Sequence, residues 1–147
     1  MKKYILAFLG ASLLSGCVTV PLASPEADQQ AKKFIAPTDK AALYVYRNSI
    51  LGTALRKIIK VDGKVIGKNA PFTYFYKLLP PGSHTVTAYT ALWGDHDYKI
   101  DMQKGKIYCL QQYMIPALPI GTVSLGEIPL KTCKEAIQSL KLIKNYQ

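Results

Sequence analysis

The chain has 147 residues, of which 49% are hydrophobic and 19% are charged, and its formal net charge is +10. This length gives room for one domain with a modest core, which argues against a multi-domain enzyme. The surplus of basic residues favours contact with anionic surfaces such as lipid head groups or acidic polymers, although a basic surface also serves solubility alone.

Residues 1–16 have the layout of a secretory signal peptide. Met1-Lys2-Lys3 is a short positive region, Ile5–Leu14 is an apolar run, and Ser15-Gly16 are small residues before Cys17. The apolar run has about ten residues, whereas a permanent transmembrane helix needs about 20, so we expect the segment to be removed. Its removal takes away two lysines and lowers the net charge from +10 to +8.

Leu14-Ser15-Gly16-Cys17 resembles the lipobox of bacterial lipoproteins, in which a large aliphatic residue and two small residues precede a cysteine. In that family the peptide is cut before the cysteine, here between Gly16 and Cys17, and the thiol and the new amino group are acylated. Three acyl chains anchor stably, since each buried methylene contributes about 0.8 kcal/mol. Val18 stands where an aspartate often marks inner-membrane retention, so the resemblance implies outer-membrane sorting. The alternative is an ordinary cysteine behind a standard signal peptide.

Cys109 and Cys133 remain once Cys17 carries lipid. An export signal implies an oxidising compartment, so we predict a disulfide between these two residues. Closing a loop of about 24 residues would stabilise the fold by about 3 to 4 kcal/mol on the chain-entropy model. Two separately buried thiols are the alternative.

Residues 17–40 are expected to form the lipidated N-terminus and a linker with a short helix in its middle. Pro21 and Pro37 lie near the two ends of this polar segment, which favours a linker leading away from the membrane. Ser24 can cap a helix that has Pro25 at its first position.

Residues 41–147 are predicted to fold as a mainly β domain, a small antiparallel β-sandwich of about seven strands with a C-terminal α-helix packed on it. Asp62-Gly63 predicts a tight hairpin. Pro80-Pro81-Gly82 predicts a turn, and Gln103-Lys104-Gly105 a turn that pairs the two strands around it. The expected strands are Ala41–Arg47, Leu55–Val61, Lys64–Ile66, Phe72–Leu79, Ser83–Leu92, Lys99–Met102 and Lys106–Ile115.

The last part of the chain is expected to be a loop followed by a helix. Pro116–Pro129 is apolar enough to lie against the domain, and it contains a candidate short strand, Thr122–Ile128. Thr132 and Glu135 stand three residues apart as a capping box. The helix should pack on the sheet through an apolar face formed by Cys133, Ala136, Ile137, Leu140 and Ile143.

Two stretches of the chain carry a family resemblance. The first is Ala31-Lys32-Lys33-Phe34 followed by Ala41–Arg47, and the second runs from Val61–Gly67 through Leu79–Val86 to Gly105–Tyr108. They resemble a family of small bacterial lipoproteins known as domain of unknown function 2846. The order of hairpin, turn and strands is also similar to PEGA-type surface modules, which are small β-sandwiches. The resemblance implies an envelope location and this fold, and it implies no activity.

Gly94-Asp95-His96-Asp97 places an imidazole between two carboxylates in a predicted loop, and His84 is the other histidine. A zinc site gathers three or four ligands, and no HExxH or CxxC spacing supplies them, so we interpret the segment as a solvated turn and expect no metal and no cofactor. No G-x-S-x-G elbow is present, and no catalytic residue is expected. The rival hypothesis is a small periplasm-facing enzyme or metal-binding protein that uses Asp95, His96 and Asp97.

Two sets of side chains are candidates for ligand contact. The tyrosine pairs Tyr44/Tyr46 and Tyr74/Tyr76 could stack on sugars, although tyrosine is also a good strand residue. The second set could meet anionic glycolipid or glycan, and a solvated edge that blocks strand aggregation explains it equally well. This basic set comprises Arg56, Lys57, Lys60, Lys64 and Lys68.

The sequence therefore predicts a membrane-anchored envelope lipoprotein whose domain acts as a structural or binding module without catalysis. It is expected at the outer membrane, facing the periplasm. The expected partners are the membrane, through the lipid anchor, and an anionic envelope glycan or glycolipid, or another envelope protein. Nucleic acid is not expected, because the chain is exported.

Overall fold

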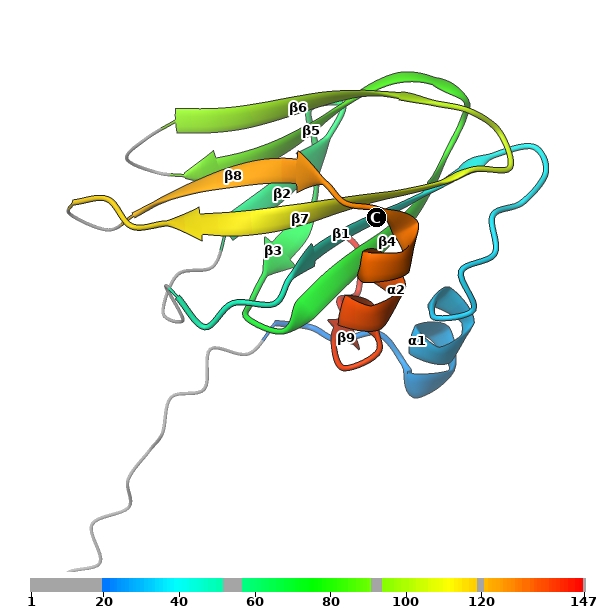
Figure 1. The fold of residues 1–147 in the computed structure, drawn as a ribbon, viewed down its shortest axis with the longest axis horizontal. Coiled ribbons are helices and arrows are strands. Elements are labelled where there is room, and N and C mark those ends of the chain that lie inside the picture. The colour runs from blue at the N-terminus through cyan, green and yellow to red at the C-terminus, as the bar shows by residue number, and fades with distance from the viewer. Residues whose placement is uncertain (1–19, 52–56, 91–93, 119–120, 147) are drawn as a thin grey trace, which may run out of the picture.

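Figure 1 shows the computed structural model of the chain, which describes residues 20–51, 57–90, 94–118 and 121–146. Over these residues the chain forms two helices and nine strands. The predicted sandwich with a C-terminal helix is confirmed, with nine strands in place of about seven. The elements are α1 Pro25–Ala31, β1 Ala41–Arg47, β2 Lys57–Val61, β3 Lys64–Asn69, β4 Thr73–Leu79, β5 Gly82–Thr90, β6 Gly94–Met102, β7 Ile107–Ile115, β8 Thr122–Glu127, α2 Leu130–Ile137 and β9 Lys141–Leu142.

The strands form two sheets. The five-stranded sheet has the order β8-β7-β1-β4-β9, and the four-stranded sheet has the order β3-β2-β5-β6. β1 lies at the centre of the larger sheet, antiparallel to β4 and parallel to β7, and the short β9 is parallel to β4. The larger sheet is therefore mixed, which corrects the expectation of an antiparallel sandwich. The chain from β2 to β6 supplies the long crossover that a parallel β1–β7 pair needs.

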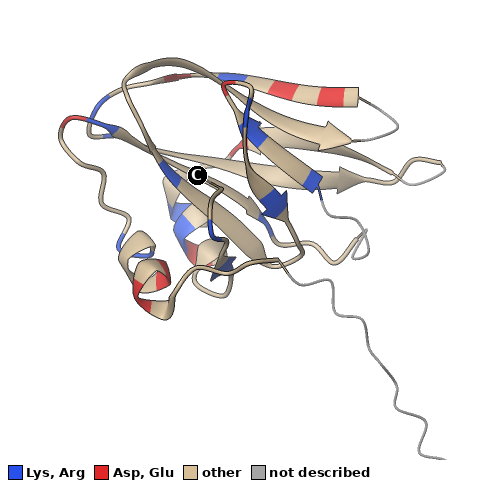
Figure 2. Cartoon of the chain, turned by 180° about the vertical axis from the view of Figure 1, so that it is seen from behind, with Lys and Arg blue, Asp and Glu red and all other residues tan. Residues whose placement is uncertain are grey.

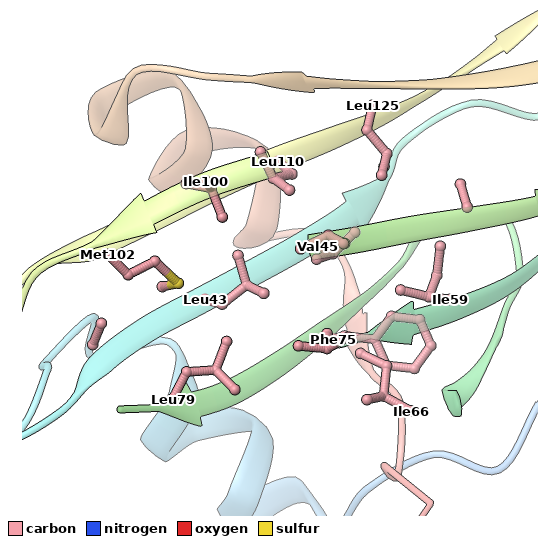
Figure 3. Close-up of a cluster of buried hydrophobic side chains, with 14 of the residues drawn as sticks. Leu43, Val45, Ile59, Ile66, Phe75, Leu79, Ile100, Met102, Leu110 and Leu125 are labelled. Carbon is pink, nitrogen blue, oxygen red and sulfur yellow. The ribbon is translucent and has the colours of Figure 1, made fainter. Parts of the chain in front are cut away.

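The main core lies between the two sheets and is built from alternate residues of the strands, because successive side chains of a strand point to opposite faces. Leu43 and Val45 of β1 and Phe75 of β4 project from the larger sheet. They meet Ile59 of β2 and Ile100 of β6 from the smaller sheet, as Figure 3 shows. All these side chains are buried, and β1 contributes Leu43 and Val45 to this core from one of its two faces.

The outer face of the larger sheet is covered by the two helices, which lie together at one end of it in Figure 1. Ala31 of α1 and Ile137 of α2 belong to the second core formed there. Cys109 of β7 and Cys133 of α2 lie in the same core and are joined by a disulfide, the pairing expected from the sequence. The disulfide therefore ties α2 to the sheet beneath it.

The described N-terminal segment lies on the domain. Val20 packs against the main core, and Leu22 forms a β-bridge with Ile143. The Ala23 N–H donates to the Leu142 carbonyl at 2.9 Å. From Val20 onward, the predicted linker is therefore bonded to the C-terminal strand of the domain.

The short helix α1 begins where the sequence predicts. The Ala27 N–H donates to Ser24 Oγ at 3.2 Å, and Pro25 occupies the first helical position. Lys32 Nζ then contacts Asp28 Oδ2 at 2.7 Å, one turn apart on the same helix. These contacts close the helix locally and leave the Asp28 carboxylate turned toward the domain.

One predicted hairpin is confirmed and one is wrong. Asp62 and Gly63 have φ of 50° and 76°, and they connect the antiparallel strands β2 and β3. The turn at Gln103-Lys104-Gly105 does not pair its neighbours, because β6 pairs with β5 in one sheet while β7 pairs with β1 and β8 in the other. This turn is a bridge between the two layers.

The C-terminal helix begins and ends earlier than expected. α2 starts at Leu130 after Pro129, so Thr132 lies inside the helix and is not its cap. The chain is extended again at Lys141–Leu142, where it pairs with β4, and Ile143 packs in the main core. The prediction of a strand near Thr122–Ile128 is confirmed by β8, which pairs with β7.

Candidate functional site

The space between the sheets turns from apolar to polar at one end. Four side chains there are at most 4% exposed, and we call them the polar cluster: Arg47, Lys57, Asn69 and Gln112. Arg47 and Gln112 belong to the larger sheet, whereas Lys57 and Asn69 are direct partners in the smaller sheet. Asn69 Nδ2 donates to Gln112 Oε1 across the gap, so the polar cluster joins the two layers.

The polar cluster holds two cations in a dry environment. Burial lowers the pKa of the Lys57 amino group, and the nearby charge of Arg47 lowers it further. Arg47 Nη2 donates to the Leu51 carbonyl. Among the described residues, no carboxylate forms an ion pair with Lys57. Two positively charged side chains are therefore buried together at this end of the sandwich, and burying charge is costly.

The sequence predicts only one member of the polar cluster as a site residue, Lys57, and expects it in a basic surface patch. It predicts Arg47 as the end of a strand. A signal was available for Arg47, since it continues the inward alternation of Leu43 and Val45 on β1. A charged residue in phase with an apolar face is a buried charge, and such groups mark sites more often than solvated ones do.

The basic set predicted around the hairpin does not form one surface. Lys57 points into the sandwich, and Lys60, on the opposite face of β2, contacts Asp95 Oδ2 at 3.3 Å. Lys64 and Lys68 are exposed on the edge strand β3, and Arg56 lies outside the described residues. Figure 2 shows acidic residues along β6 and basic residues on β2 and β3, so the outer face of the smaller sheet carries both signs.

Asp95, His96 and Asp97 lie in strand β6, not in a solvated turn. The strand runs from Gly94 because it pairs with β5 over nine residues, and charged side chains are well tolerated on such an edge strand. Asp97 accepts from Thr87 Oγ1 at 2.6 Å, and His96 Nε2 lies 3.3 Å from Ser124 Oγ on β8. Alternation places the imidazole on the opposite face of the strand from the two carboxylates.

His84 lies apart from that segment. Its Nδ1 is 2.7 Å from Asp62 Oδ2, and its Nε2 is 2.8 Å from the Pro80 carbonyl. Burial alone would lower the pKa of His84, but the Asp62 carboxylate and the Pro80 carbonyl outweigh it and raise the pKa above its ordinary value. Within the described part of the chain, no group of three histidine, cysteine or acidic side chains could hold a metal ion.

The tyrosine pairs are not a sugar-binding stripe. Tyr44, Tyr46 and Tyr74 are at most 1% exposed, because they lie on the sheet face covered by the helices. The Tyr44 ring stacks on Phe34 with centroids 4.7 Å apart, and its hydroxyl donates to the Ala31 carbonyl at 2.6 Å. These side chains fix the helices to the sheet and are closed to a large ligand.

The fold and its interior define a small disulfide-bonded β-sandwich with a polar end. Residues 37–124 match the family described as "Protein of unknown function (DUF2846)". A Haemophilus influenzae protein named only as uncharacterised is 36% identical over 137 residues, which are 92% of this chain and 81% of that relative. The chain belongs to this family. No solved structure matches it.

The residues of the predicted lipid anchor, Gly16 and Cys17, lie outside the described residues. In the described segments, neither helix has the length and apolar character needed to cross a bilayer.

Proposed function

We propose that the chain is a lipid-anchored lipoprotein of the cell envelope, sorted to the outer membrane, and that its sandwich is a non-catalytic module held against the membrane. The observation that supports this proposal is a spacing. Cys17, in a lipobox-like sequence, stands three residues before Val20, where the chain is already packed against the core. The anchor and the domain are thus almost continuous.

The length of this connection limits how far the domain can lie from the bilayer. Three residues span at most about 11 Å even when fully extended. Beyond Val20 the chain is fixed by backbone bonds, since Lys144 donates its N–H to the Pro21 carbonyl at 2.9 Å. A tether of this length holds the domain in contact with the lipid head groups.

The surface beside this connection is basic. The C-terminal segment runs along β3, where the Tyr146 N–H donates to the Ile66 carbonyl at 2.9 Å. Lys144, in the same C-terminal segment, is exposed, and so are Lys64 and Lys68 on β3. Each lysine near an anionic membrane surface contributes about 1 kcal/mol of attraction. These three lysines favour one orientation, with the β3 edge toward the phosphates.

Anchoring is tested by replacing the acylated residue. The Cys17→Ala variant should not be acylated, because no other side chain can accept the diacylglyceryl group. It should therefore be lost from the membrane fraction. Mass spectrometry of the purified wild-type chain should show an acylated N-terminal cysteine, and Thr19→Ala, the matched control, should leave acylation unchanged. A wild-type chain without acyl mass would refute the proposal. Val18→Asp should move the protein to the inner membrane.

The orientation is tested separately with vesicles. A soluble chain that begins at Val18 should bind anionic vesicles and not zwitterionic ones, and salt should weaken this binding. The triple variant Lys64→Glu, Lys68→Glu and Lys144→Glu should bind anionic vesicles about 100-fold more weakly or worse. Lys104→Glu, in the β6–β7 connection, is the control for a single charge reversal, and Lys64→Glu alone should weaken binding more than it does. Equal binding by the triple variant and the control would contradict the orientation.

A further inference from the structure

An apolar cavity of about 580 Å³ opens at the polar end of the sandwich. Its walls include Leu51, Met114, Ile115 and Leu118. Leu118 is 89% exposed and Leu51 is 54% exposed, so the walls present apolar side chains to solvent. Ligand sites in proteins commonly have volumes of about 300 to 1,000 Å³ and apolar walls with a few polar groups, and this cavity fits that description.

The cavity and the polar cluster are adjacent through two connections. Leu51 lines the cavity, and its carbonyl accepts the hydrogen bond from Arg47. Met114 lines the cavity as well, and it projects from the same face of β7 as Gln112, about 7 Å along the strand. Leu51 and Met114 therefore connect the cavity to the polar cluster.

The polar cluster has hydrogen-bonding capacity that the described residues do not use. Gln112 Nε2 and Asn69 Oδ1 are buried and have no partner among those residues. Lys57 is 4% exposed, and no described carboxylate pairs with it. Buried polar groups that are left without a partner destabilise a fold, and a buried charge does so most. A polar ligand group would remove this cost.

We propose that the cavity and the polar cluster together bind a single-chain anionic amphiphile, with its head on Lys57 and Gln112 and its acyl tail against Leu51, Met114 and Leu118. The charge of the polar cluster selects the head group, and the apolar walls select the tail. This site goes beyond the anchoring proposed above and does not depend on Cys17. The two ideas can therefore fail separately.

The experiment measures binding of three probes to the soluble chain that begins at Val18, which contains both cores and the disulfide. By calorimetry, dodecanoate should bind at least ten-fold more tightly than dodecanol, because only the former carries the head-group charge. Inorganic phosphate, which has charge but no tail, should not bind measurably.

Three variants separate the parts of the site. Lys57→Met keeps the length of the side chain and removes its charge, so it should weaken dodecanoate binding at least ten-fold and leave dodecanol binding unchanged. Leu118→Asp, at an exposed position where folding is insensitive, should weaken both. Lys60→Met removes a charge from the opposite face of the same strand and should change neither.

Two results would overturn the proposal. One is equal affinity for dodecanoate and dodecanol in the wild-type chain. The other is unchanged dodecanoate binding by a folded Lys57→Met variant, with folding checked by the thermal transition. Failure to acylate Cys17 would leave both measurements as they are, so this test and the anchoring test give independent answers.

Discussion

The Asp28 carboxylate is one of the groups that attach the N-terminal helix to the domain, and replacing it by an amide should destabilise the fold. Asp28 Oδ1 accepts from the Tyr74 hydroxyl at 2.9 Å and from the Leu142 N–H at 3.0 Å, while Lys32 Nζ contacts Oδ2 at 2.7 Å. In Asp28→Asn the first two bonds persist but become neutral. The third becomes a contact between two N–H donors, which cannot bond.

The size of the effect follows from these contacts. The side chains of Asp28 and Lys32 are each 16% exposed, so their bond is partly shielded from water. Hydrogen bonds to charged groups contribute about 1.5 to 3 kcal/mol. We expect Asp28→Asn to lower the free energy of unfolding by about 2 kcal/mol. For a domain of this size, that corresponds to a fall in Tm of about 6 to 10 °C, measured by circular dichroism.

The same carboxylate predicts a pH dependence of fixed sign. Burial alone would raise the pKa of Asp28, but the bonds from Lys32, Tyr74 and Leu142 outweigh it and lower the pKa. Because the pKa of Asp28 is lower in the folded chain, its ionised carboxylate stabilises the fold at pH values above the unfolded pKa of 3.8. This stabilisation is lost as the pH falls through the folded pKa. The Tm difference between wild type and Asp28→Asn should therefore vanish in acid.

The control is Glu135→Gln, the same chemical change at an exposed position of α2 that forms no ion pair among the described residues. It should alter Tm little at neutral pH. If both variants melt at the same temperature as the wild type, or if the difference caused by Asp28→Asn persists in acid, the carboxylate does not hold α1 as argued.

Three further outcomes follow from the geometry. Asp62→Asn should destabilise the chain more at pH 6 than at pH 8.5, as measured by urea unfolding. Asp62 raises the pKa of His84, so protonated His84 stabilises the fold below its unfolded pKa of 6.5, and this contribution is lost as the pH rises through the folded pKa. The double variant Cys109→Ala and Cys133→Ala should lower the free energy of unfolding by about 3 to 4 kcal/mol, whereas a smaller loss would indicate residual structure in the unfolded chain. Gly67→Ala should lower it by about 1 to 3 kcal/mol, because the added Cβ would lie 2.7 Å from a core phenylalanine ring.

Local signals predicted the elements whose causes are local. Asp62-Gly63 specifies its hairpin because both residues adopt positive φ, and Ser24-Pro25 specifies the start of α1 through its cap. In each case the deciding interactions lie within a few residues of one another.

The errors arose where distant partners decide. The turn at Gln103-Lys104-Gly105 has the composition of a hairpin turn. However, β7 pairs with β1 in the larger sheet, so β6 and β7 lie in different sheets. Likewise, Thr132 and Glu135 satisfy the spacing of a capping box, yet the helix already begins after Pro129. Neither outcome is encoded in the few residues that make up the motif.

The candidate site was the least predictable part. The proximity of Arg47 and Lys57 requires that β1 and β2 lie in different sheets and face each other, which no spacing reveals. The basic set seemed contiguous because its members are close in sequence, while the alternation of β2 sends Lys57 and Lys60 to opposite sides. A charge near a hairpin can therefore be a surface charge or an interior one.

The central position of β1 sets an order of assembly. This strand is made early, but its two neighbours in the sheet begin at Thr73 and Ile107, so its edges stay open until most of the chain is present. Long-range pairing of this kind is slow, and an open apolar strand is a template for aggregation. A chain truncated before Ile107 should therefore precipitate or be degraded, even though it contains most of the strands.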